Sequence, residues 1–276
     1  IRIVVEKRKE GIDEDIIRKW NLDVSVIAEV TESGKLVITD KDTLSAEIPI
    51  NLISEEAPLY NRPLAEPQYL KNTRNFDIST ISIPNNLEEV LLTLLSTPTL
   101  ASKRWIYEQY DYMVRTNTLT MPGSDAAVVR IKDTTKAVAM TVNCNSKYCY
   151  LDPYIGAGIA VAESARNLAC SGARPLAITD CLNFGSPENP EVMWQFDQAI
   201  NGMSEACLKL NSPVVSGNVS FYNETEGTAI YPTPTVGMVG LIENTETHMT
   251  QWFKNEGDLI VLLGITKEEF GGSEYL

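Results

Sequence analysis

Two stretches of this chain share one pattern, in which a short apolar strand runs directly into small and polar residues. In the first, residues 213–215 read as a buried strand, followed by Ser216, Gly217, Asn218 and Ser220. Such a strand end presents backbone N–H groups, an amide and hydroxyls, which are the groups that hold phosphate or metal-bound phosphate. Gly217 lets a ligand approach the backbone closely because it has no Cβ. An ordinary polar turn is the alternative interpretation.

The second stretch, residues 169–185, repeats this pattern. A helix ends near Cys170, a turn follows, and an apolar strand ends at Asp180 and is followed by Asn183. We therefore expect two strands that end in adjacent polar clusters, one acidic and one bearing an amide. Because ligands of sheet proteins sit beyond strand ends, these clusters mark the predicted binding region.

Bulk properties exclude several classes of protein. The net charge is −14, and the densest basic run is Lys7-Arg8-Lys9, which argues against nucleic-acid binding. No apolar stretch approaches the ~20 residues needed to span a bilayer. The five cysteines lack C-x-x-C spacing and are odd in number, which favours reduced thiols and a cytoplasmic location. A single histidine argues against zinc.

Periodicity predicts the secondary structure. Residues 1–53 have an α+β pattern, with strands at 1–5, 22–30, 36–39 and 44–50 and a helix at 14–20. The proline-punctuated residues 54–86 read as a linker that lies against a surface. Beyond it we expect helices at 87–95, 102–110, 152–169 and 190–208, strands at 137–142 and 235–242, and a buried strand at 258–263 that opens a new domain.

Three weaker motifs each have a plain structural alternative. Gly156-Ala-Gly158 lacks the third glycine of a dinucleotide fingerprint, and its glycines are better explained by close helix packing. Asp125, Glu163 and Asn167 could supply oxygen ligands for Mg²⁺, or could form a turn and a solvated helix face. Lys147 follows a strand and could meet a phosphate, or could belong to an ordinary polar loop.

At this point the chain resembles a known family. The runs that carry the resemblance are Tyr150-Leu-Asp-Pro-Tyr, residues 172–185, residues 216–225 and residues 232–240. They are long, ordered and correctly spaced, and they are similar to the second half of phosphoribosylformylglycinamidine synthases of the small bacterial or archaeal type. Residues 57–63 and 269–274 extend the similarity over essentially the whole chain. This family belongs to the aminoimidazole ribonucleotide synthetase (PurM-like) superfamily.

The resemblance implies a fold and a division into domains. Residues 1–55 correspond to the tail of a first PurM-like C-terminal α/β domain, and residues 56–86 to a linker. Residues 87–245 correspond to a second PurM-like N-terminal domain, a mixed sheet packed by helices, which carries the nucleotide and Mg²⁺ site. Residues 250–276 begin the next C-terminal domain. The chain is thus expected to be an internal piece of a longer α+β and α/β protein.

The resemblance also implies an activity. The family uses ATP and Mg²⁺ to convert formylglycinamide ribonucleotide into the formylglycinamidine ribonucleotide in purine biosynthesis. The ammonia comes from glutamine through a separate glutaminase subunit, and a small PurS-type subunit completes the complex. Two alternatives remain open, namely another ATP-using enzyme of the superfamily and a non-catalytic scaffold that holds a nucleotide. Exposed apolar strands also make self-association of the chain plausible.

Site residues follow by motif. Asp180 and Gly217 match ATP-contacting positions, Asn218 matches a Mg²⁺ ligand, and Ser220 matches a substrate contact. An auxiliary nucleotide and metal site is implied at Asp125, Glu163, Asn167 and Lys147. Two departures from the family pattern bear on these roles. The catalytic histidine and an acidic Mg²⁺ ligand of the first half lie outside this sequence, so the chain alone is expected to be inactive, and Asn143 stands where an acidic residue is common.

Overall fold

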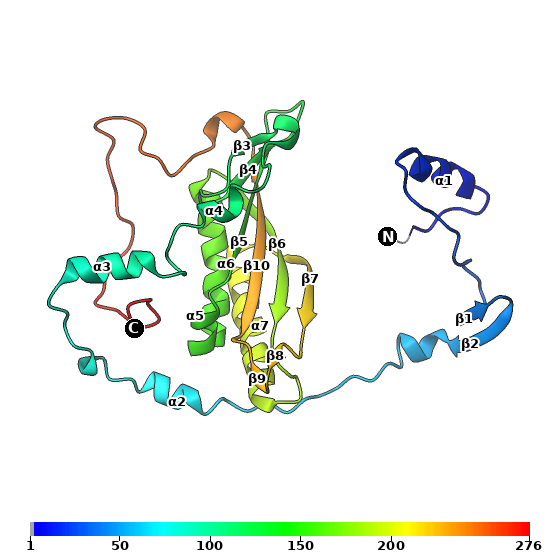
Figure 1. Ribbon diagram of the computed structural model, residues 1–276, viewed down its shortest axis with the longest axis horizontal. Coiled ribbons are helices and arrows are strands. Elements are labelled where there is room, and N and C mark those ends of the chain that lie inside the picture. Colours follow the sequence, from blue (N-terminus) through cyan, green and yellow to red (C-terminus); the bar gives the residue numbers. More distant parts are fainter. Residues whose placement is uncertain (1–2) are drawn as a thin grey trace. The chain divides into compact units, whose positions relative to one another are not determined.

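The computed structural model describes residues 3–276, and the chain divides into two units, one ending at Asn61 and one spanning Arg62–Leu276. The division falls inside the proline-punctuated segment 56–86. The first unit contains α1 (Glu10–Lys19), β1 (Lys35–Asp40), β2 (Thr43–Pro49) and the 3-10 turn η1 (Ile50–Ile53), as Figure 1 shows.

The two strands of the first unit form an antiparallel hairpin in which Leu36 pairs with Ile48. The chain reverses at Lys41 and Asp42, whose φ angles are 47° and 68°. Two successive residues with positive φ make the tight turn whose twist suits antiparallel strands. The strands predicted at 36–39 and 44–50 are confirmed, as is the helix predicted at 14–20, which starts four residues earlier.

Two other strands predicted for this unit do not form. Residues 22–30 have an alternating pattern but no strand structure, and the strand at 1–5 is absent over residues 3–5, its first two residues lying outside the described part. Alternation makes a strand only where a neighbouring edge can accept its backbone hydrogen bonds. Within residues 3–61, β1 and β2 pair only with each other.

The second unit is built on a six-stranded sheet in the order β3-β4-β5-β10-β6-β7. Neighbouring strands are antiparallel except β6 and β7, which are parallel. The single parallel pair makes the sheet mixed, as the fold prediction requires. The strands are β3 (Thr118–Thr120), β4 (Ala127–Arg130), β5 (Ala137–Asn143), β6 (Arg174–Asn183), β7 (Val214–Ser220) and β10 (Thr233–Ile242).

Two long helices, α6 (Pro153–Cys170) and α7 (Pro190–Leu210), cover one face of this sheet (Figure 1). Each begins with proline at its first position, after a capping residue: Asp152 accepts a hydrogen bond from the Ile155 N–H, and Asn189 accepts one from the Glu191 N–H. Alternate residues of β10, from Val236 to Ile242, are buried against this layer. The core therefore lies between the helices and one sheet face.

Glycines allow α6 to pack closely against α7 and against α5 (Ser146–Leu151). A Cβ at Gly202 of α7 would lie 1.9 Å from the carbonyl oxygen of Tyr154 in α6, and a Cβ at Gly156 would lie 2.5 Å from the backbone nitrogen of Cys149. A Cβ at Gly158 of α6 would lie an ordinary 3.5 Å from the Gly202 carbonyl oxygen. These contacts confirm the interpretation of Gly156 as a packing residue, whereas Gly158 has room for a Cβ.

The remaining elements are short and connect or flank the sheet. They are α2 (Tyr69–Arg74), η2 (Ile78–Thr80), α3 (Leu87–Ser96), α4 (Arg104–Tyr107), η3 (Val114–Thr116), α5 (Ser146–Leu151), β8 (Glu224–Thr225), β9 (Thr228–Ala229) and η4 (Thr245–Thr247). The buried strand predicted at 258–263 is wrong, because these residues are exposed and no strand among residues 3–276 pairs with them.

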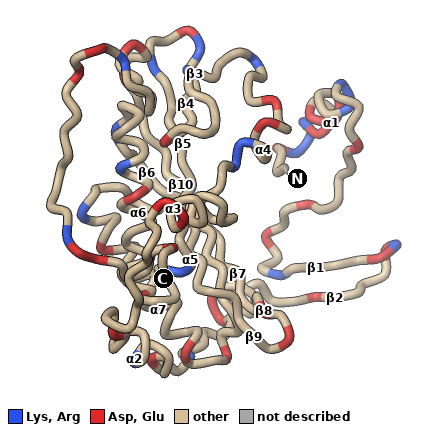
Figure 2. The backbone as a smooth tube through the Cα atoms, turned by 60° about the vertical axis from the view of Figure 1, so that its left-hand side comes forward, with Lys and Arg blue, Asp and Glu red and all other residues tan. Residues whose placement is uncertain are grey.

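The distribution of charged residues and the length of the helices bear on the possible environment of the chain. Along the described backbone, Lys and Arg positions are scattered among Asp and Glu positions rather than gathered into one run (Figure 2). Among residues 3–276, each helix is too short or too polar to pass through a bilayer.

Candidate functional site

The two polar clusters predicted from the sequence lie side by side on the parallel pair β6 and β7. Asp180 pairs in register with Gly217, Cys181 with Asn218, and Asn183 with Ser220. The adjacency of the clusters is thus confirmed. Their expected place beyond the strand ends is wrong, because the backbone pairing of β6 and β7 continues through both clusters to Asn183 and Ser220.

Asp180 points toward the helical layer. It shares a side of β6 with Ile178 and Leu182, which are both buried in the core. Partial burial raises the pKa of the Asp180 carboxyl, and burial together with the Asp180 charge raises the pKa of Cys207 in α7. The carboxyl group makes no hydrogen bond or ion pair with residues 3–276. It is therefore a partly desolvated acid without a partner in this part of the protein.

The Asp180 carboxyl group lies so close to position 217 that only glycine fits there. A Cβ on Gly217 would lie 2.2 Å from Oδ1 of Asp180, well inside any tolerable contact. Because β7 is the last strand of the sheet, its outer backbone groups face away from β6 and are free to bind a ligand. Gly217 therefore leaves space for the Asp180 carboxylate and keeps the backbone approachable.

Asn218 and Ser220 point to the opposite, uncovered face of the sheet. Successive side chains of a strand alternate between faces, and the Ser216 hydroxyl reaches Thr179 Oγ1 at 2.7 Å on that uncovered side. Asn218 is exposed, and its amide makes no hydrogen bond with any residue from 3 to 276. The sheet thus separates the predicted metal and substrate residues from Asp180 by its own thickness.

Ser220 is held by a residue that the sequence interpretation missed. The Asn223 amide nitrogen donates to the carbonyl oxygens of Ser220 at 2.9 Å and Phe184 at 3.0 Å, and to Ser220 Oγ at 3.1 Å. These bonds fasten the end of β7 to the residue that follows β6. An asparagine three residues after a strand's last serine is a turn signal that could have indicated this role.

The residues at this site fit a magnesium ion only in part. Mg²⁺ prefers carboxylate and water oxygens in octahedral geometry. Asn218 offers one amide oxygen, its neighbours on the same face are the Thr179 hydroxyl and the Cys181 thiol, and the nearby carboxylate of Asp180 faces the other way. Within residues 3–276 no three acidic, histidine or cysteine side chains gather to hold a metal. A metal at Asn218 would need most of its ligands from elsewhere.

The auxiliary residues are brought together only in part. The Asn143 amide nitrogen donates to Ser164 Oγ at 2.9 Å and to Thr141 Oγ1 at 3.1 Å, and the Asn167 amide nitrogen donates to Asn143 Oδ1 at 3.2 Å. Asn143 therefore joins β5 to α6, and the side-chain Oδ1 of Asn167 makes no hydrogen bond with residues 3–276. Sequence reasoning treated Asn143 only as a departure and missed this role.

Glu163 and Lys147 lie near this network but have other neighbours. A hydrogen bond from Cys149 lowers the pKa of Cys144, and both burial and the Glu163 charge oppose this shift without reversing it. Lys147 Nζ is bound by both carboxylate oxygens of Glu274, at 2.8 and 2.9 Å. Asp125 stands in the turn before β4. Lys147 is therefore not free for a phosphate in this structure.

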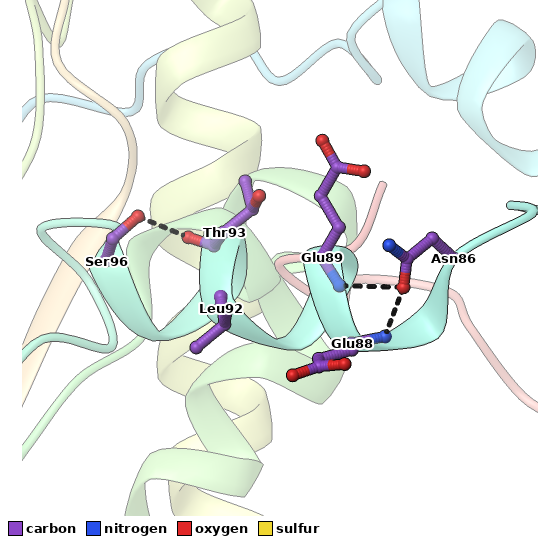
Figure 3. Close-up of a pocket in the computed structure, with 6 residues that line it drawn as sticks. All are labelled: Asn86, Glu88, Glu89, Leu92, Thr93 and Ser96. Atoms are coloured by element: carbon purple, nitrogen blue, oxygen red, sulfur yellow. Dashed lines mark hydrogen bonds between the residues drawn. The ribbon is translucent and has the colours of Figure 1, made fainter.

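Two open depressions in the second unit contain none of the predicted site residues. One of about 430 Å³ runs along α3 and is lined by Asn86, Glu88, Glu89, Leu92, Thr93 and Ser96 (Figure 3). Asn86 Oδ1 accepts from the Glu88 and Glu89 N–H groups, so it caps the helix, and the two carboxylates would repel a phosphate. The other, of about 440 Å³, lies by Arg174 and Leu210, away from Asn183 and Ser220.

Comparison with known proteins shows what this chain is similar to. Residues 123–242 match the family described as AIR synthase related protein, N-terminal domain. The chain is 54% identical over 271 residues to phosphoribosylformylglycinamidine synthase subunit PurL of Moorella thermoacetica, covering 97% of this chain and 37% of that protein. The predicted mixed α/β fold with a PurM-like N-terminal domain is thereby confirmed.

Solved structures of Thermotoga maritima PurL agree. The one complexed with ADP is 31% identical and superposes with a TM-score of 0.69 over 89% of this chain and 38% of that one. The one complexed with FGAR is 31% identical, with a TM-score of 0.67 over 87% and 36%, and PurL within PurLQS is 31% identical, with a TM-score of 0.68 over 89% and 38%. The chain is thus similar to PurL proteins over most of its own length, and it spans little more than a third of the length of these relatives.

Proposed function

We propose that this chain is a portion of a phosphoribosylformylglycinamidine synthase and contributes to its ATP and substrate sites. The full enzyme would use ATP to convert formylglycinamide ribonucleotide into formylglycinamidine ribonucleotide in purine biosynthesis. The observation that carries the proposal is the 54% identity to PurL over 97% of this chain. Structures of a relative with ATP, ADP and FGAR support the choice of ligands.

The reaction needs an activated amide. An amide carbon is a poor electrophile, and its oxygen leaves only after it carries phosphate. Transfer of the ATP γ-phosphoryl group to that oxygen, followed by attack of ammonia and loss of phosphate, gives the amidine. Preorganised backbone dipoles stabilise the charge that develops. When bound, Mg²⁺ would neutralise charge on the nucleotide phosphates.

The residues of β6 and β7 have distinct proposed roles. Asp180 and Gly217 contact ATP, with Gly217 doing so through its backbone on the free edge of the sheet. Asn218 supplies one oxygen ligand to the metal, and Ser220, fixed by Asn223, contacts the ribonucleotide. Asp125, Glu163, Asn167 and Lys147 form an auxiliary nucleotide site, in which Lys147 must first leave Glu274.

The same proposal names partners. The name of the Thermotoga maritima PurLQS structure supports further subunits. We expect these to be a separate glutaminase and a small PurS-type subunit in a cytoplasmic complex. The uncovered sheet face exposes Met140, Val142 and Val239, and we expect another sheet, from the rest of the protein or from a second copy, to cover it. The chain alone is expected to have no synthase activity.

The test is ADP release by the full-length protein with ATP, Mg²⁺ and ammonium, with and without formylglycinamide ribonucleotide. Release that depends on the ribonucleotide supports the proposal. A folded full-length protein that binds ATP but gives no ribonucleotide-dependent ADP would overturn it. Asn201→Ala, which removes an exposed amide on α7, serves as the matched control for variants at Asn218.

A further inference from the structure

The segment 62–74, which reads as a linker in the sequence, is fastened to the sheet domain at several points. The Ala65 N–H donates to the Pro190 carbonyl oxygen at 3.1 Å, and the Gln68 N–H donates to Glu191 Oε1 at 3.3 Å. Pro67 and Leu70 are fully buried. A flexible linker would leave such apolar residues in water, so this segment packs as part of the domain.

Tyr69 makes the most specific contacts in this segment. Its hydroxyl donates to the Tyr150 carbonyl oxygen in α5 at 2.7 Å and accepts from the amide of Gln195 in α7 at 2.9 Å. Gln195 is only 8% exposed, so loss of its partner would leave a buried amide without a hydrogen bond. Burial raises the pKa of Tyr69 to about 12, so the hydroxyl keeps its proton at neutral pH.

A stack of three tyrosine rings extends from Tyr69 toward the sheet. The Tyr69 and Tyr150 rings lie 4.0 Å apart with 3° between their planes, and the Tyr150 and Tyr231 rings lie 4.5 Å apart at 25°. Tyr231 comes just before the fully buried Pro232 and the first residue of β10. Stacked rings of this kind add stability beyond the area that they bury.

The stack ends beside the start of β10, in the sheet that carries the candidate site. Thr233 Oγ1 donates to the Tyr231 carbonyl oxygen at 2.7 Å, and the Asn183 amide nitrogen reaches the Thr233 carbonyl oxygen at 3.4 Å. Asn183 in turn is the register partner of Ser220. A continuous line of contacts therefore joins Tyr69 to the end of β6 and β7.

We propose that residues 62–74 form a fixed strap, and that Tyr69 is a positioning residue that holds α5 and the start of β10 in place for the site on β6 and β7. The contacts described above are the evidence for the strap. Its effect on ribonucleotide binding also depends on the proposed function.

The first test is hydrogen exchange on this chain with Tyr69→Phe, which removes the hydroxyl and keeps the ring. We expect exchange about tenfold faster at residues 146–151 and 231–235, the change that corresponds to about 1.4 kcal/mol of lost local stability. Gln195→Met removes the other partner and should accelerate the same residues. Phe76→Leu, at an exposed ring two residues beyond the segment, should leave them unchanged. Acceleration confined to 62–74 would overturn the strap.

The second test uses the full-length enzyme. Tyr69→Phe should raise KM for the ribonucleotide by roughly 3- to 10-fold with a smaller change in kcat, whereas Phe76→Leu should change neither. Faster exchange with unchanged KM and kcat would overturn the positioning role. If the wild-type enzyme shows no ribonucleotide-dependent turnover, the proposed function fails, and the exchange experiment still decides the strap.

Discussion

The carboxylate of Asp180 occupies the space that a side chain at Gly217 would need. The two residues are register partners on parallel strands, and a Cβ on Gly217 would come within 2.2 Å of Asp180 Oδ1. Each residue therefore constrains the other. The need for glycine at position 217 comes from its neighbour across the strands, and the backbone freedom of glycine is not needed because the φ angle of Gly217 is not positive.

The first prediction concerns this pair. Gly217→Ala should lower the free energy of unfolding by about 1–3 kcal/mol, because the methyl group displaces the Asp180 carboxylate or the β7 backbone. The double variant Asp180→Ala/Gly217→Ala should recover part of that loss, since the clashing oxygen is gone. Thermal or denaturant unfolding of the four proteins in this cycle measures the coupling. Additive losses would show that the two residues do not compete for space.

The pH dependence of stability provides a second prediction. Asp180 binds its proton more tightly in the folded state, because burial raises its pKa above the ordinary 3.8. The folded state is thus relatively favoured below pH 3.8, and this advantage is lost as pH rises through the folded pKa. Asp180→Asn should therefore raise the unfolding midpoint at neutral pH and match the wild type at low pH. An equal midpoint at neutral pH would contradict a desolvated carboxylate.

A third prediction separates the two faces of β6 and β7 in the full-length enzyme. Asn218→Ala should lower kcat by about 10- to 100-fold if its amide is a metal ligand, and excess Mg²⁺ should restore part of the loss. Ser220→Ala should mainly raise KM for the ribonucleotide. Steady-state kinetics at several Mg²⁺ concentrations test both variants, with Asn201→Ala as the control. Wild-type behaviour of Asn218→Ala at limiting Mg²⁺ would remove it from the metal site.

The contact between α6 and α7 provides a fourth prediction. Gly202→Ala should destabilise the protein by about 1–3 kcal/mol, because its methyl group would meet the Tyr154 carbonyl oxygen. Gly158→Ala is the matched control on the facing helix. Its Cβ meets its nearest neighbour at 3.5 Å, and alanine has the better helix propensity, so the variant should be neutral or up to ~1 kcal/mol more stable. The unfolding midpoints of the two variants, measured under the same conditions, test this prediction. Equal midpoints would contradict a steric clash at Gly202.

The sequence predicted helices and strands best where the signals that specify them lie within the element itself. The helices α6 and α7 follow from a capping residue, a proline at the first position and a long apolar stripe, and all of these are local. The strands predicted at 22–30 and 258–263 failed because alternation or an apolar run specifies a strand only when a partner edge exists. The residues within such a segment do not show whether a partner strand is available.

For the candidate site, the sequence by itself determined which residue types gather, namely an acid, a glycine, an amide and a serine in two matching runs. Only the tertiary structure decided that these runs are adjacent parallel strands and that Asp180 and Asn218 face opposite sides of the sheet. It also revealed Asn143, Asn223 and Tyr69, whose roles depend on partners far along the chain. The physical reason is that a motif is a run of residues that are neighbours in the sequence. The register of a strand, and the sheet face to which each side chain points, are fixed by hydrogen bonds between strands that are distant in sequence.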